Sequence, residues 1–278
     1  MSARFFQSGS LVCLEPIWPA PPNVRARVTT RFGGVSQGAY SSFNLAQHVG
    51  DRPEAVLANR QRLRHDLNLP TEPLWLKQVH GAGVRSPHEM SAQGECEADA
   101  ASTRTPGVVL VVLTADCIPV FFTDRDGTRA GIAHAGWRGL AAGVLEATVR
   151  ALEAKPRDLL AWIGPGIEPE RYETGPEIRR VFADPEWAGA FRPSGRAGYA
   201  YTDLARIADL KLARLGVGWI GSSALGTGAR GDDFYFYSYR REGATGRIAS
   251  LIYLESGETG IPSVDPPRED LGQLLKQR

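Results

Sequence analysis

VVLVVLTADCIPVFF, residues 108–122, is the stretch that decides the fold. The six residues 108–113 show no polar alternation, which is expected for a central strand covered on both faces. IPVFF, 118–122, reads as a neighbouring strand. The turn between the two carries Asp116 and Cys117. The stretch therefore predicts a buried sheet with polar side chains at one edge.

Further strands and helices alternate on either side of this stretch, with no internal repeat. Apolar and β-branched composition predicts strands at 11–14, 24–30, 74–79, 130–133, 234–239 and 248–254. Helical periodicity predicts helices over 52–68, from 137 to about 151, around 178–182 and over 204–215. The alternation predicts an α/β or α+β fold, with a mixed β-sheet covered by helices.

Helix starts and loops are read from local signals. Asp51 with Glu54, and Thr174 with Glu177, have the spacing of capping boxes and predict two helix N-termini. Residues 184–202 show little periodicity and predict a loop or lid. We expect one domain over 1–260 and a polar tail over 261–278, with a subdivision near residue 190 left open.

Composition sets the broad class. The 278 residues are 42% hydrophobic and 23% charged, with a formal net charge of +1. Ordinary globular composition argues against disorder, and the balanced charge argues against nucleic-acid or membrane partners. The chain shows no apolar run of signal-peptide or membrane-spanning length, and its three cysteines have no framework spacing. These features predict a cytoplasmic protein with reduced thiols, and they leave its oligomeric state open.

Three side chains stand at predicted strand ends beside glycines or tight turns: His80 in QVHG, Cys117 in TADC and His134 in AHAGWRG. Two imidazoles and a thiolate fill three positions of a tetrahedral zinc site and leave the fourth open, as in catalytic sites. The spacings of 37 and 17 residues match no short zinc signature. Two other readings stay open: a buried Cys117 with packed histidines, or a Cys117 nucleophile with a histidine base.

Seven blocks of sequence, in order, resemble the YfiH-type family. They are TTRFGGVSQGAYSSFNLAQHVGD (29–51), WLKQVHG (75–81), ADA (98–100), VLTADCIPV (112–120), AHAGWRGLAAGV (133–144), WIGPGIEPERYETG (162–175) and FYSYRREGATGR (236–247). Members of that family carry the labels multicopper polyphenol oxidase and laccase-domain protein. They are also described as purine nucleoside phosphorylases and, in bacteria, as peptidoglycan editing factors.

The resemblance implies a YfiH/CNF-like cysteine-hydrolase architecture with a metal-binding active site at His80, Cys117 and His134. It implies phosphorolysis of adenosine, inosine and S-methyl-5′-thioadenosine, with adenosine deamination as a further activity. The implied partners are a purine nucleoside and phosphate, and the implied cofactor is Zn²⁺, with Cu²⁺ as the alternative. A peptidoglycan editing hydrolase that removes a wrongly incorporated amino acid from a muramyl precursor is the competing reading. A copper phenol oxidase is less favoured, because five histidines are too few for a laccase copper set.

Phosphorolysis needs cationic groups for phosphate and polar groups for the nucleoside. Arg31 beside two glycines and Arg138 at a predicted helix start are candidates for phosphate, or else for surface and carboxylate pairs. Asp116 is a candidate for proton transfer or for orienting His80 or His134. Asn44 and Gln78 are candidates for reading a purine edge or ribose hydroxyls, or for tying down their own loops.

Two departures from the family pattern stand out. Many relatives carry a Cys-Thr pair before the late aromatic segment, whereas this chain has ALGTGARGDD at 224–233. The role of the segment 221–233 is therefore left open. The usual YEVG reads YETG here, which keeps Glu173.

Overall fold

The computed structural model describes residues 3–87, 96–228 and 234–256. The boundary expected at 260 and the polar tail at 261–278 lie outside the described residues. Among the helices described, none is long and apolar enough to cross a membrane.

Two large sheets form the centre of the molecule. The first is antiparallel, with strands in the order β1 (Ala3–Ser8), β2 (Leu11–Pro16), β3 (Val24–Thr29), β16 (Ile248–Leu254) and β8 (Leu110–Thr114). The second has the order β15 (Trp219–Ser222), β11 (Leu159–Ile163), β9 (Ile118–Asp124), β10 (Ala130–Ala135), β7 (Ala100–Thr103) and β5 (Val84–Arg85). Its outer pairs are parallel and its inner pairs antiparallel, so the predicted mixed sheet is confirmed.

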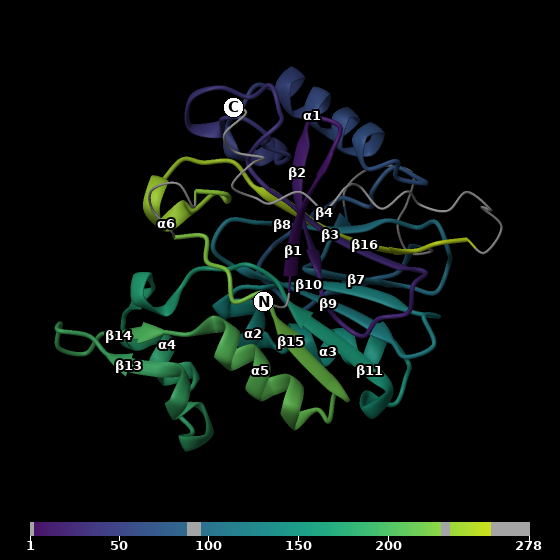
Figure 1. The fold of residues 1–278 in the computed structure, drawn as a ribbon. Helices are drawn as coiled ribbons and strands as arrows, with labels where there is room; N and C mark the ends of the chain where they lie inside the picture. Colours follow the sequence, from purple (N-terminus) through teal and green to yellow (C-terminus); the bar gives the residue numbers. More distant parts are fainter. Residues whose placement is uncertain (1–2, 88–95, 229–233, 257–278) are drawn as a thin grey trace.

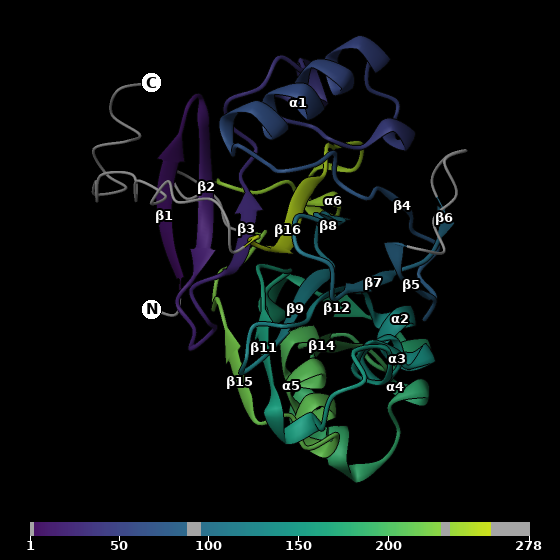
Figure 2. The same cartoon turned by 90° about the vertical axis from the view of Figure 1, so that its right-hand side faces the viewer.

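Helices cover the outer face of each sheet, which gives four layers (Figure 1). Helix α1 (Pro53–Asp66) packs on the five-stranded sheet. On the far side lie α2 (Trp137–Ala142), α3 (Val144–Ala151), α4 (Pro176–Val181) and α5 (Leu204–Arg214) (Figure 2). The short α6 (Tyr239–Glu242) and two small sheets, β12–β14–β13 (Glu173–Thr174, Ala200–Thr202, Phe191–Pro193) and β4–β6 (Leu76–Lys77, Cys96–Glu97), complete the fold.

The two large sheets pack face to face through a shared apolar core. Leu110 and Val112 of β8 contribute from one sheet, and Phe121 of β9 and Trp162 of β11 from the other. Every residue of β8 and β9 is buried, because each strand has apolar partners on both faces. Burial on both faces explains the unbroken apolar runs of the sequence.

The expectation that 108–113 and 118–122 are neighbours in one sheet is wrong. β8 pairs with β16, whereas β9 pairs with β10 and β11 in the other sheet. The turn 114–117 carries the chain from one sheet to the other. Continuous hydrophobicity shows that both faces are covered, but it cannot say whether a helix or a second sheet covers them.

The helices lie where periodicity predicts them, but their capping differs. Asp51 does not cap α1: the N-cap is Arg52 without a side-chain bond, and Asp51 accepts from Ser36 and Asn44 instead. Thr174 likewise bonds the main chain of Ala200 rather than α4. Both capping-box predictions are therefore wrong, because tertiary partners compete for the same side chains.

Three other expectations are corrected. The helix expected from 137 to about 151 is broken at Gly143, whose φ of 88° is left-handed, into α2 and α3. The expected loop or lid at 184–202 contains a 3-10 helix (Pro185–Ala190) followed by β13 and β14, and β14 pairs with both β13 and β12. The expected strand at 234–239 is instead an irregular aromatic segment that leads into α6, and the strand at 74–79 shortens to β4.

We expect Phe121→Ala to lower the free energy of unfolding by about 3–5 kcal/mol, because it leaves a cavity where the sheets meet. Leu57→Ala, on the exposed face of α1, is the control and should change it by less than about 0.5 kcal/mol. Urea unfolding followed by circular dichroism measures both. Equal midpoints for the two variants would contradict the inter-sheet core.

Candidate active site

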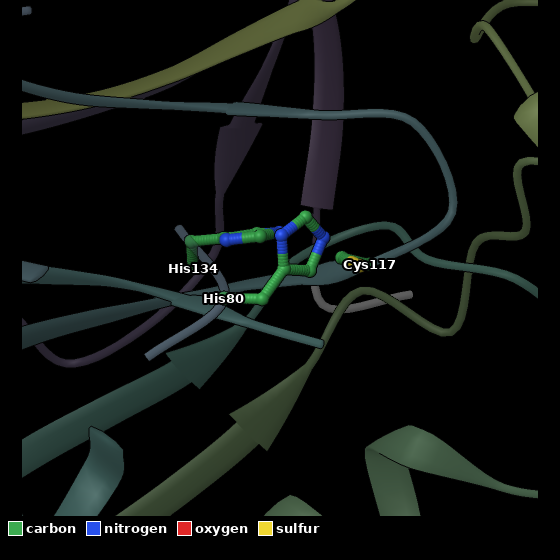
Figure 3. Close-up of side chains that lie close together, drawn as sticks. All are labelled: His80, Cys117 and His134. Atoms are coloured by element: carbon green, nitrogen blue, oxygen red, sulfur yellow. The ribbon is translucent and has the colours of Figure 1, made fainter. Parts of the chain in front are cut away.

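His80, Cys117 and His134 meet at one point. His80 follows β4, Cys117 immediately precedes β9, and His134 lies near the end of β10. Their ligand atoms all lie within 4.8 Å of one another, and Figure 3 shows the side chains turned toward one another. The imidazole rings stand edge to face, with centroids 4.8 Å apart.

The pairing of β9 with β10 explains part of this convergence. In that register His134 lies opposite Pro119, so Cys117 emerges from the same end of the sheet. The chain after β10 must then pass close to the thiol. A Cβ on Gly136 would lie 2.7 Å from the Cys117 sulfur, so only glycine fits at this position.

Asp99 fixes both histidines, and the sequence analysis did not single it out. Its carboxylate is fully buried and accepts a hydrogen bond of 2.8 Å from Nδ1 of His134. It also accepts from the main-chain N–H groups of Val79, His80 and Gly81, at 3.2, 2.9 and 2.7 Å. His80 adopts a left-handed φ of 59°, a conformation that these bonds stabilise. The only signal for Asp99 was the ADA block of the family resemblance.

The charges of the cluster are coupled. Burial raises the pKa of the Cys117 thiol, but the charge of His134 and hydrogen bonds from His134 and His80 outweigh burial and lower it. Burial lowers the pKa of His134, but the charge of Cys117 and the bond to Asp99 raise it above its ordinary value. Without metal, the pair therefore favours a thiolate beside an imidazolium.

The donor set suits a metal ion. Because Nδ1 of His134 is bound to Asp99, its Nε2 is left to face the other two ligand atoms. Carboxylate–histidine pairs of this kind are the usual support for zinc ligands. Two nitrogens and one sulfur satisfy three positions of a zinc or copper site and leave one for substrate.

A cavity of about 510 Å³ opens beside the cluster. Its volume is in the range of small-molecule sites. The lining comprises His48, Gln78, His80, Leu113, Thr114, Ala115, Asp116, Cys117, His134, Trp137, Arg138, Tyr172, Tyr239, Arg240 and Arg247. Aromatic and cationic side chains therefore surround the three candidate ligands.

Asp116 lines the cavity but does not orient the histidines. Its carboxylate accepts from the hydroxyl of Thr227 at 2.7 Å and from the main-chain N–H of Arg240 at 2.6 Å. Its main-chain oxygen accepts from Ile167. The expectation that Asp116 supports His80 or His134 is wrong, because Asp99 fills that role. Asp116 instead ties the 114–117 turn to the start of α6.

Two further candidates serve their own loops. Both ends of the Gln78 amide bond the main chain of Leu113, at 2.7 and 2.8 Å, although Gln78 lines the cavity. The buried Asn44 donates to Asp51 and accepts from the main-chain N–H of Arg247. Both side-chain amides are thus engaged in hydrogen bonds within the protein, as expected if Gln78 and Asn44 hold their own loops in place.

The structure does not bring Arg31 to the cavity. Its guanidinium is buried, pairs with Glu242 at 3.1 Å and lies over the rings of Phe234 and Tyr237. Arg138 does line the cavity, as do Arg240 and Arg247, which the sequence analysis passed over. The block FYSYRREGATGR contained both of them, and it was the available signal.

Residues 221–228, the described part of the segment without the family cysteine, include a contact with Asp116 through Thr227. A Cβ on Gly226 would lie 1.9 Å from the carboxyl group of Glu168, which in turn accepts from the main-chain N–H of Gly228. Glu168 therefore occupies the space that a larger side chain at 226 would need. The hydroxyl of the neighbouring Thr227 donates to the Asp116 carboxylate.

Comparison with known proteins agrees with this architecture. The family profile described as multi-copper polyphenol oxidoreductase laccase matches residues 25–255. The chain belongs to this laccase family. The YfiH-type resemblance is thereby confirmed, since relatives of this laccase-family chain include the YfiH protein of Escherichia coli.

Curated relatives and solved structures cover nearly the whole of the laccase-family chain. A purine nucleoside phosphorylase of Pseudomonas aeruginosa is 48% identical over 87% of this chain and 98% of its own, and the E. coli purine nucleoside phosphorylase YfiH is 44% identical over 87% and 98%. The crystal structure of a Neisseria meningitidis protein, 42% identical, covers 91% of this chain and 99% of its own with a TM-score of 0.81. The crystal structure of YlmD from Geobacillus stearothermophilus, 29% identical, covers 91% of this chain and 99% of its own with a TM-score of 0.82.

We expect Asp99→Asn to weaken Zn²⁺ binding by about 10- to 100-fold, because an amide cannot accept from all four donors. Competition with a chromophoric chelator measures the affinity. Asp126→Asn, at an exposed turn, is the matched control and should bind as the parent does. Equal affinity in both variants would show that Asp99 does not support the site.

We expect Cys117 in metal-free protein to be alkylated by iodoacetamide with a half-maximal rate near pH 6, because its pKa is lowered to about 6. The thiolate persists above that pH and is lost by protonation below it. A Cys96→Ala background removes the other partly exposed thiol. Zn²⁺ should protect Cys117, and a midpoint above pH 8 would refute the thiolate–imidazolium pair.

Proposed function

We propose that the chain is a purine nucleoside phosphorylase that acts on adenosine, inosine and S-methyl-5′-thioadenosine, with adenosine deamination as a side activity. The observation that carries the proposal is the cavity, in which a His80–Cys117–His134 cluster adjoins aromatic and cationic side chains. The names of the curated relatives, 40–48% identical, support it. Zn²⁺ is the proposed metal, with copper as the alternative.

In the proposed reaction, an oxygen of hydrogen phosphate forms a bond to C1′ of the sugar while the C1′–N9 bond breaks. The electron pair of that bond leaves with the purine, which takes up the proton that hydrogen phosphate gives up. The products are the free base and ribose 1-phosphate, or 5-methylthioribose 1-phosphate from S-methyl-5′-thioadenosine. The protein must hold phosphate against C1′, stabilise positive charge on the sugar and hydrogen-bond the leaving base.

The lining offers a partner for each need. Trp137, Tyr172 and Tyr239 bring aromatic rings to the cavity lining, where a purine could contact them, and Arg138 is the candidate for phosphate that the sequence predicted. His134, whose Nδ1 bonds Asp99, would hold the metal through Nε2. A metal bound by the three ligands would supply Lewis acidity, which deamination in particular requires.

We expect the purified protein to release hypoxanthine from inosine only when phosphate is present, with ribose 1-phosphate formed in equal amount. Cys117→Ala and His134→Ala should each reduce the rate by about 100-fold or more, because each removes a ligand. Cys96→Ala is the matched control and should keep the parent rate. Chromatographic quantification of base and sugar phosphate measures this.

Release of the base without phosphate would show hydrolysis in place of phosphorolysis. If no base is released under either condition, the proposed activity is wrong.

A peptidoglycan editing hydrolase is the second candidate, and the lowered thiol pKa of Cys117 beside His134 favours it. In that reaction Cys117 and the histidines would hydrolyse an amide bond of a muramyl precursor. Incubation with a muramyl-serine substrate separates the two candidates. Free serine, in place of phosphate-dependent hypoxanthine, would favour the hydrolase.

A further inference from the structure

Three arginines on the cavity wall lack a carboxylate partner. Arg138, Arg240 and Arg247 line the cavity, and within residues 3–87, 96–228 and 234–256 none of them forms an ion pair. Arg31, by contrast, is paired with Glu242. Three guanidinium groups without an ion pair therefore line the cavity, together with the Asp116 carboxylate and the Cys117 thiol.

Arg247 is the most constrained of the three. Its Nη1 donates to the carbonyl groups of Thr245 and Gly246, at 2.8 and 2.9 Å, and its main-chain N–H donates to Asn44 at 3.0 Å. The preceding residue must be glycine, because a Cβ on Gly246 would lie 2.6 Å from the Tyr237 ring. Burial lowers the pKa of Arg247 by more than the nearby Cys117 and Asp116 raise it, as expected for a partly desolvated cation with no ion-pair partner.

The guanidinium groups of Arg240 and Arg138 contact neutral groups, whereas the main chain of Arg240 bonds the Asp116 carboxylate. The main-chain N–H of Arg240 donates to Asp116, its Nη1 donates to the carbonyl of Glu173 at 2.8 Å, and its guanidinium lies 4.9 Å from the Tyr172 ring centre. The guanidinium of Arg138 lies 4.5 Å from the centre of the Trp137 ring. Carbonyl groups and aromatic faces fix the direction of a guanidinium without cancelling its charge.

We propose that Arg138, Arg240 and Arg247 form a subsite for a phosphoryl dianion, occupied by inorganic phosphate in the reaction proposed above, on which this identification of the ligand rests. Guanidinium groups bind phosphate oxygens through paired N–H donors, and a partly enclosed cavity strengthens such bonds. The subsite and the His80–Cys117–His134 cluster line the same cavity. Arg31 has no part in it, because Glu242 already holds its guanidinium.

Direct binding of inorganic phosphate to the full-length, zinc-loaded chain tests the subsite independently of catalysis. We expect isothermal titration calorimetry to show binding that weakens about tenfold or more in Arg138→Gln and in Arg247→Gln. Arg104→Gln, an exposed residue paired with Glu153, is the matched control and should bind phosphate as the parent does. Zinc content and thermal unfolding should be unchanged in Arg138→Gln, whose side chain is exposed, so this variant carries the test if Arg247→Gln fails to fold.

The outcomes separate the subsite from the proposed function. Phosphate affinity or the KM for phosphate equal to the parent in Arg138→Gln would overturn the subsite, even if phosphorolysis itself is observed. If phosphate does not bind but inosine 5′-monophosphate does, and Arg138→Gln weakens it, the subsite stands as a phosphate-ester site while phosphorolysis is lost. Failure of both anions to bind would overturn the subsite outright.

Discussion

The buried carboxylate of Asp99 is the constraint on which the site depends. It accepts from Nδ1 of His134 and from three successive main-chain N–H groups at 79–81. One anion therefore fixes the ring of one candidate ligand and the backbone of another. The bonds outweigh the cost of burial and lower the pKa of Asp99, so the carboxylate stays charged. The main-chain oxygen of Asp99 also accepts a hydrogen bond from the main-chain N–H of His134, which joins Asp99 to strand β10.

The cavity lies where the chain crosses from one large sheet to the other. The 114–117 turn carries the chain between them, and Asp116 within it has a left-handed φ of 89°. The Asp116 carboxylate accepts hydrogen bonds from Thr227 and from the main-chain N–H of Arg240 at the start of α6. Asp116 therefore links its chain neighbour Cys117 to the segment that carries Arg240. Asp116 thus connects the candidate metal ligands to the part of the proposed anion subsite that comes from the later segment 240–247.

How much the sequence could predict differs between fold and site. Apolar runs and helical periodicity predicted the mixed fold and most elements, because burial and period are local properties. They could not show that β8 and β9 belong to different sheets, since either arrangement buries the same residues. Strand-end position and side-chain chemistry singled out His80, Cys117 and His134. Asp99 was missed because a lone aspartate between alanines carries no local sign of its partners, which lie 18–35 residues away. Arg31 was selected for its neighbouring glycines, yet its distant partner Glu242 decides its role.

We propose that the two imidazoles and one thiolate of His80, His134 and Cys117 bind a single metal ion beside a cationic cavity. X-ray absorption at the metal edge of the purified full-length protein tests it most directly. We expect one sulfur at about 2.3 Å and two imidazole nitrogens at about 2.0–2.1 Å, completed by one light atom. A metal shell of oxygen and nitrogen without sulfur would contradict the account.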